Sequence, residues 1–265
     1  CGLYTHCFAV MDFLASEIMA LFYTFLWPFI RFSAFFLTAP LFSLAAVSVR
    51  IRIILGLLLT WVVYPFLDIP LIDPLSSVGI SEVFVQASVG AIAGIILQLV
   101  NAAIVVGGQS MSASMGLAMA NMVDPNMGNV PVISQFLLIC GVLVFMILGG
   151  HLIVIEIMAD SFRVLPVGVP LSILTLVEGL LIWSGSMFVG ALMIALPVLA
   201  SLLFINLGLG VITRSAPSLN IFALGFPAMI LGGMVIIAIS MPGFVRRAES
   251  LWFLAFDRIR LAYGI

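Results

Sequence analysis

A chain of 265 residues in which 64% are hydrophobic and 8% are charged lacks the polar surface of a water-soluble protein. Its mean hydropathy is +1.37. Nine basic and eleven acidic residues leave a net charge of −2 and no basic patch. This composition excludes a soluble enzyme, a nucleic-acid-binding protein and a disordered chain. The apolar excess requires an apolar solvent or extensive burial against partner proteins.

Charge-free stretches broken by Pro, Gly and polar clusters predict an all-α, polytopic integral membrane protein, because about 20 apolar helical residues cross a bilayer. Six apolar helices are expected near residues 13–37, 49–66, 82–106, 132–160, 172–205 and 221–241. A final amphipathic segment, 244–265, combines arginines with aromatic residues, and its helix over 244–263 is expected to lie at the membrane interface. Residues 1–10 form a leader of unassigned status.

The arginines do not define one membrane topology, although arginine-bearing loops should face the cytoplasm. Arg50 follows the first predicted helix, whereas Arg246 and Arg247 follow the sixth, which puts these sites on opposite sides of the membrane. Arg214, after the fifth helix, agrees with Arg50. We therefore expect that one element is re-entrant, or that these helices are not all ordinary lipid-facing spans.

Small residues four positions apart predict close contacts between helices. Gly90 and Gly94 form one such pair, and Ser186 and Gly190 form another. Pro197 is expected to kink the fifth helix, because proline removes one backbone hydrogen bond and clashes with the preceding turn.

No constellation in this sequence is typical of a catalytic or metal site. Gly108 to Ser112 resembles a nucleophile elbow, but the second glycine is missing and no strand pattern precedes it. Four isolated acid–base residues remain, which are His151, Glu156, Asp160 and Glu178. The first three form either a proton relay or a helix end that emerges into water, and both interpretations stay open. We expect no catalytic residue, no metal and no cofactor.

Residues 107–131, here called the plug segment, are the most informative part of the sequence, because four methionines recur in it at helical spacing. On a helix of about 100° per residue they share an arc of about 80°. Methionine is flexible and fills irregular gaps, so the pattern predicts either a packing seam or a deformable plug that seals a channel. The candidate plug residues are Gly107, Gly108, Gln109, Met111, Met115, Gly116, Met119 and Met122.

Residues 206–220 join the last two apolar helices and carry one charge without any acidic residue. The segment is either a plain hairpin loop or a docking site for a partner protein. Its candidate docking residues are Asn206, Gly208, Arg214 and Pro217.

Residues 206–222, followed by Gly225-Phe226-Pro227, resemble the signature of the flagellar biosynthetic protein FliR family. This family provides a membrane component of the type III export gate and is related to the SctT proteins of virulence secretion. Further matches, in the same order along the chain, are Arg31 to Arg50, Gly107 to Pro131 and Gly150 to Pro166. The resemblance covers roughly residues 13–245.

The resemblance implies a FliP-like helical part over 11–170, which contains the plug segment, and a FliQ-like helical hairpin over 171–243. It implies a structural core subunit of the flagellar export gate in the bacterial inner membrane and flagellar basal body. That subunit would join FliP and FliQ subunits and membrane lipid, meet FlhB on the cytoplasmic side, and form and plug the channel for unfolded export substrates. The family has no cofactor and no catalytic residues.

The resemblance favours the plug over the packing seam at 107–131 and the docking site over the plain loop at 206–220. A small-solute secondary transporter remains the alternative function, because Gly-interrupted helices also occur in transporters. No convincing internal repeat supports that alternative.

Overall fold

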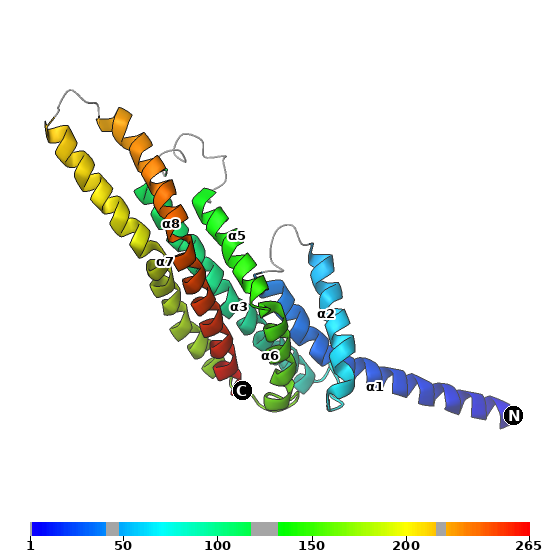
Figure 1. The fold of residues 1–265 in the computed structure, drawn as a ribbon. Helices are drawn as coiled ribbons and strands as arrows, with labels where there is room; N and C mark the ends of the chain where they lie inside the picture. The colour runs from blue at the N-terminus through cyan, green and yellow to red at the C-terminus, as the bar shows by residue number, and fades with distance from the viewer. Residues whose placement is uncertain (1, 41–47, 118–131, 216–220) are drawn as a thin grey trace. The chain divides into compact units, whose positions relative to one another are not determined.

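The computed structural model describes the backbone of residues 2–40, 48–117, 132–215 and 221–265. It describes the side chains of residues 17–40, 48–117, 132–215 and 225–265. In this part of the chain every element is a helix, which confirms the all-α expectation (Figure 1). The helices are α1 (Gly2–Thr38), α2 (Val49–Val63), the 3-10 helix η1 (Tyr64–Phe66), α3 (Ser77–Ser114), α5 (Val132–Ile147), α6 (Gly150–Val164), α7 (Ile173–Ser215) and α8 (Ile221–Tyr263).

Five of the described helices are long and apolar enough to cross a membrane. They are the Glu17–Thr38 part of α1, α2 with η1, α3, α7, and the Gly225–Tyr263 part of α8. The pair α5 and α6 bends at its break and would add a sixth span if it is counted as one. The expectation of a polytopic membrane protein is therefore confirmed.

Helix ends differ from the expected ones in several places. The helix α3 continues to Ser114 and α7 to Ser215, so residues 107–114 and 206–215 are helical rather than loop. The helix expected over 132–160 is interrupted at Gly149, whose φ of 66° is a left-handed conformation that glycine adopts readily. Apolar periodicity continues across this break, which is why the sequence pattern suggested one helix.

The C-terminal segment is not a separate helix, and its expected position at the membrane interface stays a prediction. Residues 244–263 continue α8 through Pro242, because a proline removes only one hydrogen bond of a long helix. Two of its aromatic residues are buried in the protein, since Trp252 and Phe256 are each 1% exposed, whereas Phe253 is 45% exposed. Part of the apolar face of this segment therefore contacts protein.

The chain forms two compact units. Unit 1 consists of Cys1–Gln98, Ile153–Leu181 and Arg258–Ile265, and unit 2 consists of Leu99–Leu152 and Ile182–Asp257. Each unit therefore combines segments that are far apart in the sequence.

Two glycines bring α1 and α3 into backbone contact in unit 1. A Cβ atom at Gly90 would overlap the carbonyl oxygen of Arg31. A Cβ atom at Gly94 would overlap the side chain of Thr38. Helices can approach this closely only where one of them lacks side chains, as in the small-residue motifs of membrane proteins.

The buried guanidinium of Arg31 connects α1 to α3 and to the end of α6 in unit 1. Arg31 is 1% exposed. Its Nε donates to Gln86 Oε1 at 2.6 Å, its Nη1 to Ser161 Oγ at 2.9 Å, and its Nη2 to the carbonyl of Leu165 at 2.8 Å. The guanidinium carbon also lies 3.9 Å from the ring centre of Phe162. The cation is thus held by directed hydrogen bonds and an aromatic face in place of water.

The buried carboxylate of Glu82 is linked to the Arg31 guanidinium through the side-chain amide of Gln86. Gln86 Nε2 donates to Glu82 Oε1 at 2.6 Å, and the backbone N–H of Gly168 donates to the same oxygen at 3.1 Å. Glu82 is 5% exposed. The opposite charges of Arg31 and Glu82 are therefore bridged by the side chain of Gln86, and the connection between α6 and α7 is tied to α3.

The core of unit 2 forms around Trp252 of α8. Its ring lies edge-on to Phe145 of α5 with the centroids 4.7 Å apart, and Phe145 also contacts Phe256 at 5.8 Å. The indole N–H donates to the carbonyl of Gly141 at 3.1 Å. Such aromatic pairs contribute about 0.5–1.5 kcal/mol beyond the area they bury.

Many serine and threonine hydroxyls in these helices donate to a carbonyl of their own preceding turn. Thr60 donates to Gly56 at 2.7 Å. Near the end of α3, Ser110 donates to Val106 at 2.9 Å and Ser114 donates to Ser110 at 3.0 Å. A hydroxyl satisfied in this way can lie in an apolar environment without a partner from another helix.

Replacing Gly90 by Ala tests the backbone contact between α1 and α3. The added methyl group would overlap the Arg31 carbonyl, so we expect a loss of about 1–3 kcal/mol, the usual effect of overpacking. Gly185→Ala in α7 is the matched control, because nothing lies within 4 Å of its Cβ position, and helix propensity should make it neutral or stabilising by up to about 1 kcal/mol. Thermal denaturation of the protein co-purified in detergent with its membrane partners measures both. Equal stability of the two variants would contradict the contact.

Candidate functional site

The first part of the plug segment forms the C-terminal end of α3, where the helix stops in a Schellman motif. Gly116 has φ of 81°, its N–H donates to Ala113 at 3.0 Å, and the N–H of Leu117 donates to Ser112 at 3.1 Å. This left-handed position favours glycine strongly. Gly116 is therefore the signal in the sequence that ends α3, ten residues beyond the expected helix end.

The two glycines at the start of the plug segment are packing positions in unit 2. A Cβ atom at Gly107 would lie 3.1 Å from the carbonyl oxygen of Ala191 in α7. A Cβ atom at Gly108 would lie 2.6 Å from the Cα atom of Ser134 in α5. Both glycines let a neighbouring helix approach α3, and Gln109 beside them is partly exposed.

Two of the four regularly spaced methionines of the plug segment are described, and both are buried inside unit 2. Met111 is 2% exposed and Met115 is 0% exposed. Met115 lies against Gly233 of α8, where an added Cβ atom would be 2.5 Å from its Cε. Met119 and Met122 lie outside the described residues. Met115 thus packs the end of α3 against α8.

The C-terminal end of α3 with the turn after it, the end of α7 and the start of α8 line an open pocket of about 300 Å³. Met115 and Gly116 line it from α3, Asn206 and Gly210 from α7, and Phe226 from α8. Phe226 lies against Gly116, where an added Cβ atom would be 3.2 Å from its ring. The structure therefore brings two predicted plug residues together with one predicted docking residue.

The other predicted docking residues do not line this pocket. Gly208 is exposed on α7 with nothing within 4 Å of its Cβ position. Arg214 is exposed in the last turn of α7, where a cation compensates the negative end of the helix dipole. Pro217 lies outside the described residues.

The second predicted packing pair lies where α7 approaches α3 and α8 in unit 2. A Cβ atom at Gly190 would be 2.9 Å from Leu251 and 3.5 Å from Ala103. The hydroxyl of Ser186 donates to the carbonyl of Trp183 at 2.5 Å, within its own helix.

The isolated acid–base residues show no shared site among the described positions. Asp160 pairs with Arg163 one turn away at 3.4 Å, with side-chain exposures of 39% and 82%. Glu156 and Glu178 are exposed. The Nδ1 of His151 is buried and has no hydrogen-bond partner. In the ranges that the structure describes, no group of three His, Cys, Asp or Glu side chains could hold a metal ion.

Two arginines with defined partners were not singled out from the sequence. Arg31 appeared only as the first residue of a segment that matches the family, and Arg247 only as one of the basic residues after the sixth predicted helix. Arg247 Nη1 donates to the carbonyl of Met193 in α7. The sequence could have indicated only that an arginine within an apolar segment needs a polar partner. It does not indicate which residue that partner is.

Comparison with known proteins decides the family. The profile described as "Bacterial export proteins, family 1" matches residues 22–254. The chain is 38% identical over 234 residues to the flagellar biosynthetic protein FliR of Pectobacterium carotovorum subsp. carotovorum, which covers 88% of this chain and 90% of that protein. The chain belongs to the FliR family of bacterial export proteins.

Other members of the FliR family match over a similar length. The flagellar biosynthetic protein FliR of Escherichia coli (strain K12) is 33% identical over 229 residues, covering 85% of this chain and 87% of the relative. The FliR protein of Aquifex aeolicus (strain VF5) is 30% identical over 236 residues, covering 88% and 90%. The family resemblance found in the sequence is thereby confirmed.

Proposed function

We propose that this protein is a membrane-embedded structural subunit of the bacterial flagellar protein-export apparatus. Family membership carries this proposal, because the profile match covers residues 22–254 and the full-length relatives are named flagellar biosynthetic protein FliR. The described helices that are long and apolar enough to cross a membrane support a site of action in the bacterial inner membrane, within the flagellar basal body.

The length of α7 supports a role in a multi-subunit assembly. Its 43 residues extend about 65 Å at 1.5 Å per residue, whereas the apolar core of a bilayer is about 30 Å thick. Large exposed hydrophobic side chains occur along the whole helix, at Leu174 (68%), Ile182 (75%), Phe204 (74%) and Val211 (66%). Lipid can cover only about half of such a helix. The other half needs apolar protein surface.

We assign that surface to FliP-like and FliQ-like subunits. In this proposal residues 11–170 are the FliP-like part, residues 171–243 are the FliQ-like hairpin, and the subunits together surround a channel for unfolded flagellar proteins. An FlhB protein docks at the cytoplasmic end. The protein acts by structure alone, without a cofactor.

Co-expression with FliP and FliQ in a strain that lacks its own FliR tests this proposal. We expect one complex that contains all three proteins and restored secretion of flagellar subunits, whereas the chain expressed alone should aggregate or be degraded. A monodisperse chain that is stable alone in mild detergent and binds a small solute would favour the secondary transporter instead.

The plug segment is the part of the chain that we propose to seal the idle channel. Met111 and Met115 are buried against unit 2, so in this proposal they anchor the segment, and the sealing side chains are those of Met119 and Met122. Soft, flexible methionines suit a seal that a passing polypeptide must displace and that must close again.

Two double variants separate anchoring from sealing. Met111→Ala with Met115→Ala removes buried side chains at about 2–5 kcal/mol each, so we expect less assembled complex. Met119→Ala with Met122→Ala should leave assembly intact and let small ions pass, measured as conductance or as growth inhibition on expression.

A control pair uses methionines on the surface of the chain, Met146→Ala and Met234→Ala, which are 45% and 59% exposed. This pair should change neither assembly nor leakage. An assembled Met119→Ala/Met122→Ala complex that is as tight as the wild type would rule out the proposed seal.

The end of α7 and the residues after it form the proposed docking site for FlhB. A cysteine at Ser215, which is exposed, should crosslink to that partner in cells. Arg214→Glu should reduce secretion without loss of the complex, because it reverses the charge in the last turn of α7. Arg214→Lys keeps the charge and is the control. Labelling of the Ser215→Cys variant only from the periplasmic side would contradict this placement.

A further inference from the structure

Pro197 leaves one backbone carbonyl of α7 without its usual donor. Proline has no N–H, so position 197 cannot donate to the carbonyl of Met193 four residues earlier. The helix α7 is a candidate membrane span, and an unpaired carbonyl is strongly unfavourable wherever a helix lies in an apolar environment.

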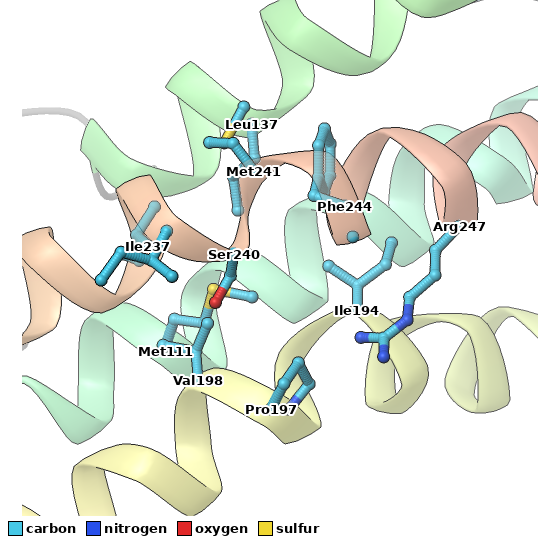
Figure 2. Close-up of a pocket in the computed structure, with 12 residues that line it drawn as sticks. Met111, Leu137, Ile194, Pro197, Val198, Ile237, Ser240, Met241, Phe244 and Arg247 are labelled. Carbon is cyan, nitrogen blue, oxygen red and sulfur yellow. The ribbon is translucent and has the colours of Figure 1, made fainter.

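Arg247 of α8 supplies the missing donor within unit 2. Its Nη1 donates to the carbonyl of Met193. Figure 2 shows the guanidinium of Arg247 directed from α8 toward α7 near Pro197. The contact also gives the half-buried Arg247 a hydrogen-bond partner on the neighbouring helix. One hydrogen bond thus satisfies two groups that would otherwise be costly.

The surroundings of this bond leave space for movement. A cavity of about 210 Å³ lies beside it, lined by Pro197 and Ile194 from α7, by Phe244 and Arg247 from α8, and by Met111 from α3 (Figure 2). A tightly packed interior would oppose any change of helix direction, whereas an open cavity does not.

The stretch of α8 that faces the cavity is itself weakened. Pro242 lies inside α8 and removes one further backbone hydrogen bond from that helix. Gly243, which lines the cavity, has nothing within 4 Å of its Cβ position. Both helices are therefore locally deformable at the same cavity, and the bond from Arg247 joins them there.

We propose that Arg247 is a positioning residue that, from α8, fixes the direction of α7 beyond Pro197. With the bond in place, α7 has one preferred direction beyond Pro197. When the bond is broken, the two helices can change direction into the cavity. The inference concerns the geometry of unit 2. Its first test rests on the proposed function, because it measures assembly and secretion, whereas the distance measurement below needs no export.

The first test uses the chemistry of proline. Arg247→Met removes the donor, and Pro197→Ala restores the N–H that can donate to Met193 within the helix. We expect Arg247→Met to lower the amount of assembled FliP–FliQ complex and its secretion by about tenfold, the factor that corresponds to the loss of one hydrogen bond from a charged donor. In the Pro197→Ala background the same substitution should have no further effect. Arg247→Lys should retain most activity, because its ammonium group can still donate.

Arg246→Met is the matched control, because Arg246 is the exposed neighbour on the same helix and the change removes the same charge. It should behave like the wild type in both backgrounds. An equal defect of Arg247→Met with and without Pro197 would overturn the proposal, and so would a defect shared by Arg246→Met. If Arg247→Met does not assemble, its recovery by Pro197→Ala supports the proposal and its failure to recover overturns it.

A distance measurement reads the bend without any export. Spin labels on cysteines at Ile182 and Phe204, which are 75% and 74% exposed, flank Pro197 on α7, with the natural cysteines replaced by alanine. We expect a narrow distance distribution for the wild type and for Arg247→Lys, and a broad one for Arg247→Met. Pro197→Ala, alone or with Arg247→Met, should give a narrow distribution near the roughly 33 Å of a straight helix.

An unchanged distribution in the assembled Arg247→Met complex would overturn the proposal, whatever the secretion result. If Pro197→Ala prevents assembly, the distance distributions are compared in the chain that keeps Pro197. A broad distribution for Arg247→Met but not for Arg247→Lys or Arg246→Met then supports the proposal, and equal distributions overturn it. If secretion is lost while the distance distribution is unchanged, Arg247 does not position α7. The proposed export function is not contradicted by that result.

Discussion

The close approach of other helices to α3 is the constraint on which the rest of the structure depends. In unit 1, Gly90 and Gly94 bring α1 against its backbone, and in unit 2, Gly107 and Gly108 bring α7 and α5 against it. Water does not drive apolar helices together within a bilayer, so packing at short distance must supply the attraction. Four positions without side chains on one helix provide that distance. Larger residues at these positions would separate the helices and open the cores around Arg31 and Trp252.

The few charges inside the fold obey one rule, which is that each has a partner within the protein. Arg31 uses Gln86 and Ser161 side chains together with a carbonyl, and Arg247 uses the carbonyl of Met193. Carbonyl oxygens are suitable acceptors because they carry partial charge and need no counterion that must also be desolvated. The planar guanidinium can reach several acceptors at once, which an ammonium group cannot match in this geometry.

Apolar periodicity predicted the helices well, and the helix expected over 49–66 corresponds to α2 with η1. The ends of helices were harder to predict, because a glycine or a proline can either end a helix or lie inside it. Gly149 breaks the chain between α5 and α6 and Gly116 ends α3, whereas Pro242 leaves α8 continuous. Only the neighbouring helices decide which outcome is lower in free energy. The candidate site was located by its glycines and methionines, but burial of Met115 depends on Gly233, more than one hundred residues away in the sequence.

The hydroxyls at the end of α3 have a consequence for how this surface meets water. Ser110 and Ser114 both donate to carbonyls of their own helix, so their only hydrogen atoms capable of hydrogen bonding are already committed. The outward face then presents methylene groups and weak acceptors. Its wettability is closer to that of an alanine-rich helix than to that of a serine-rich one. A neighbouring molecule that contacts this face can therefore donate hydrogen bonds to the serine oxygens but cannot accept one from them.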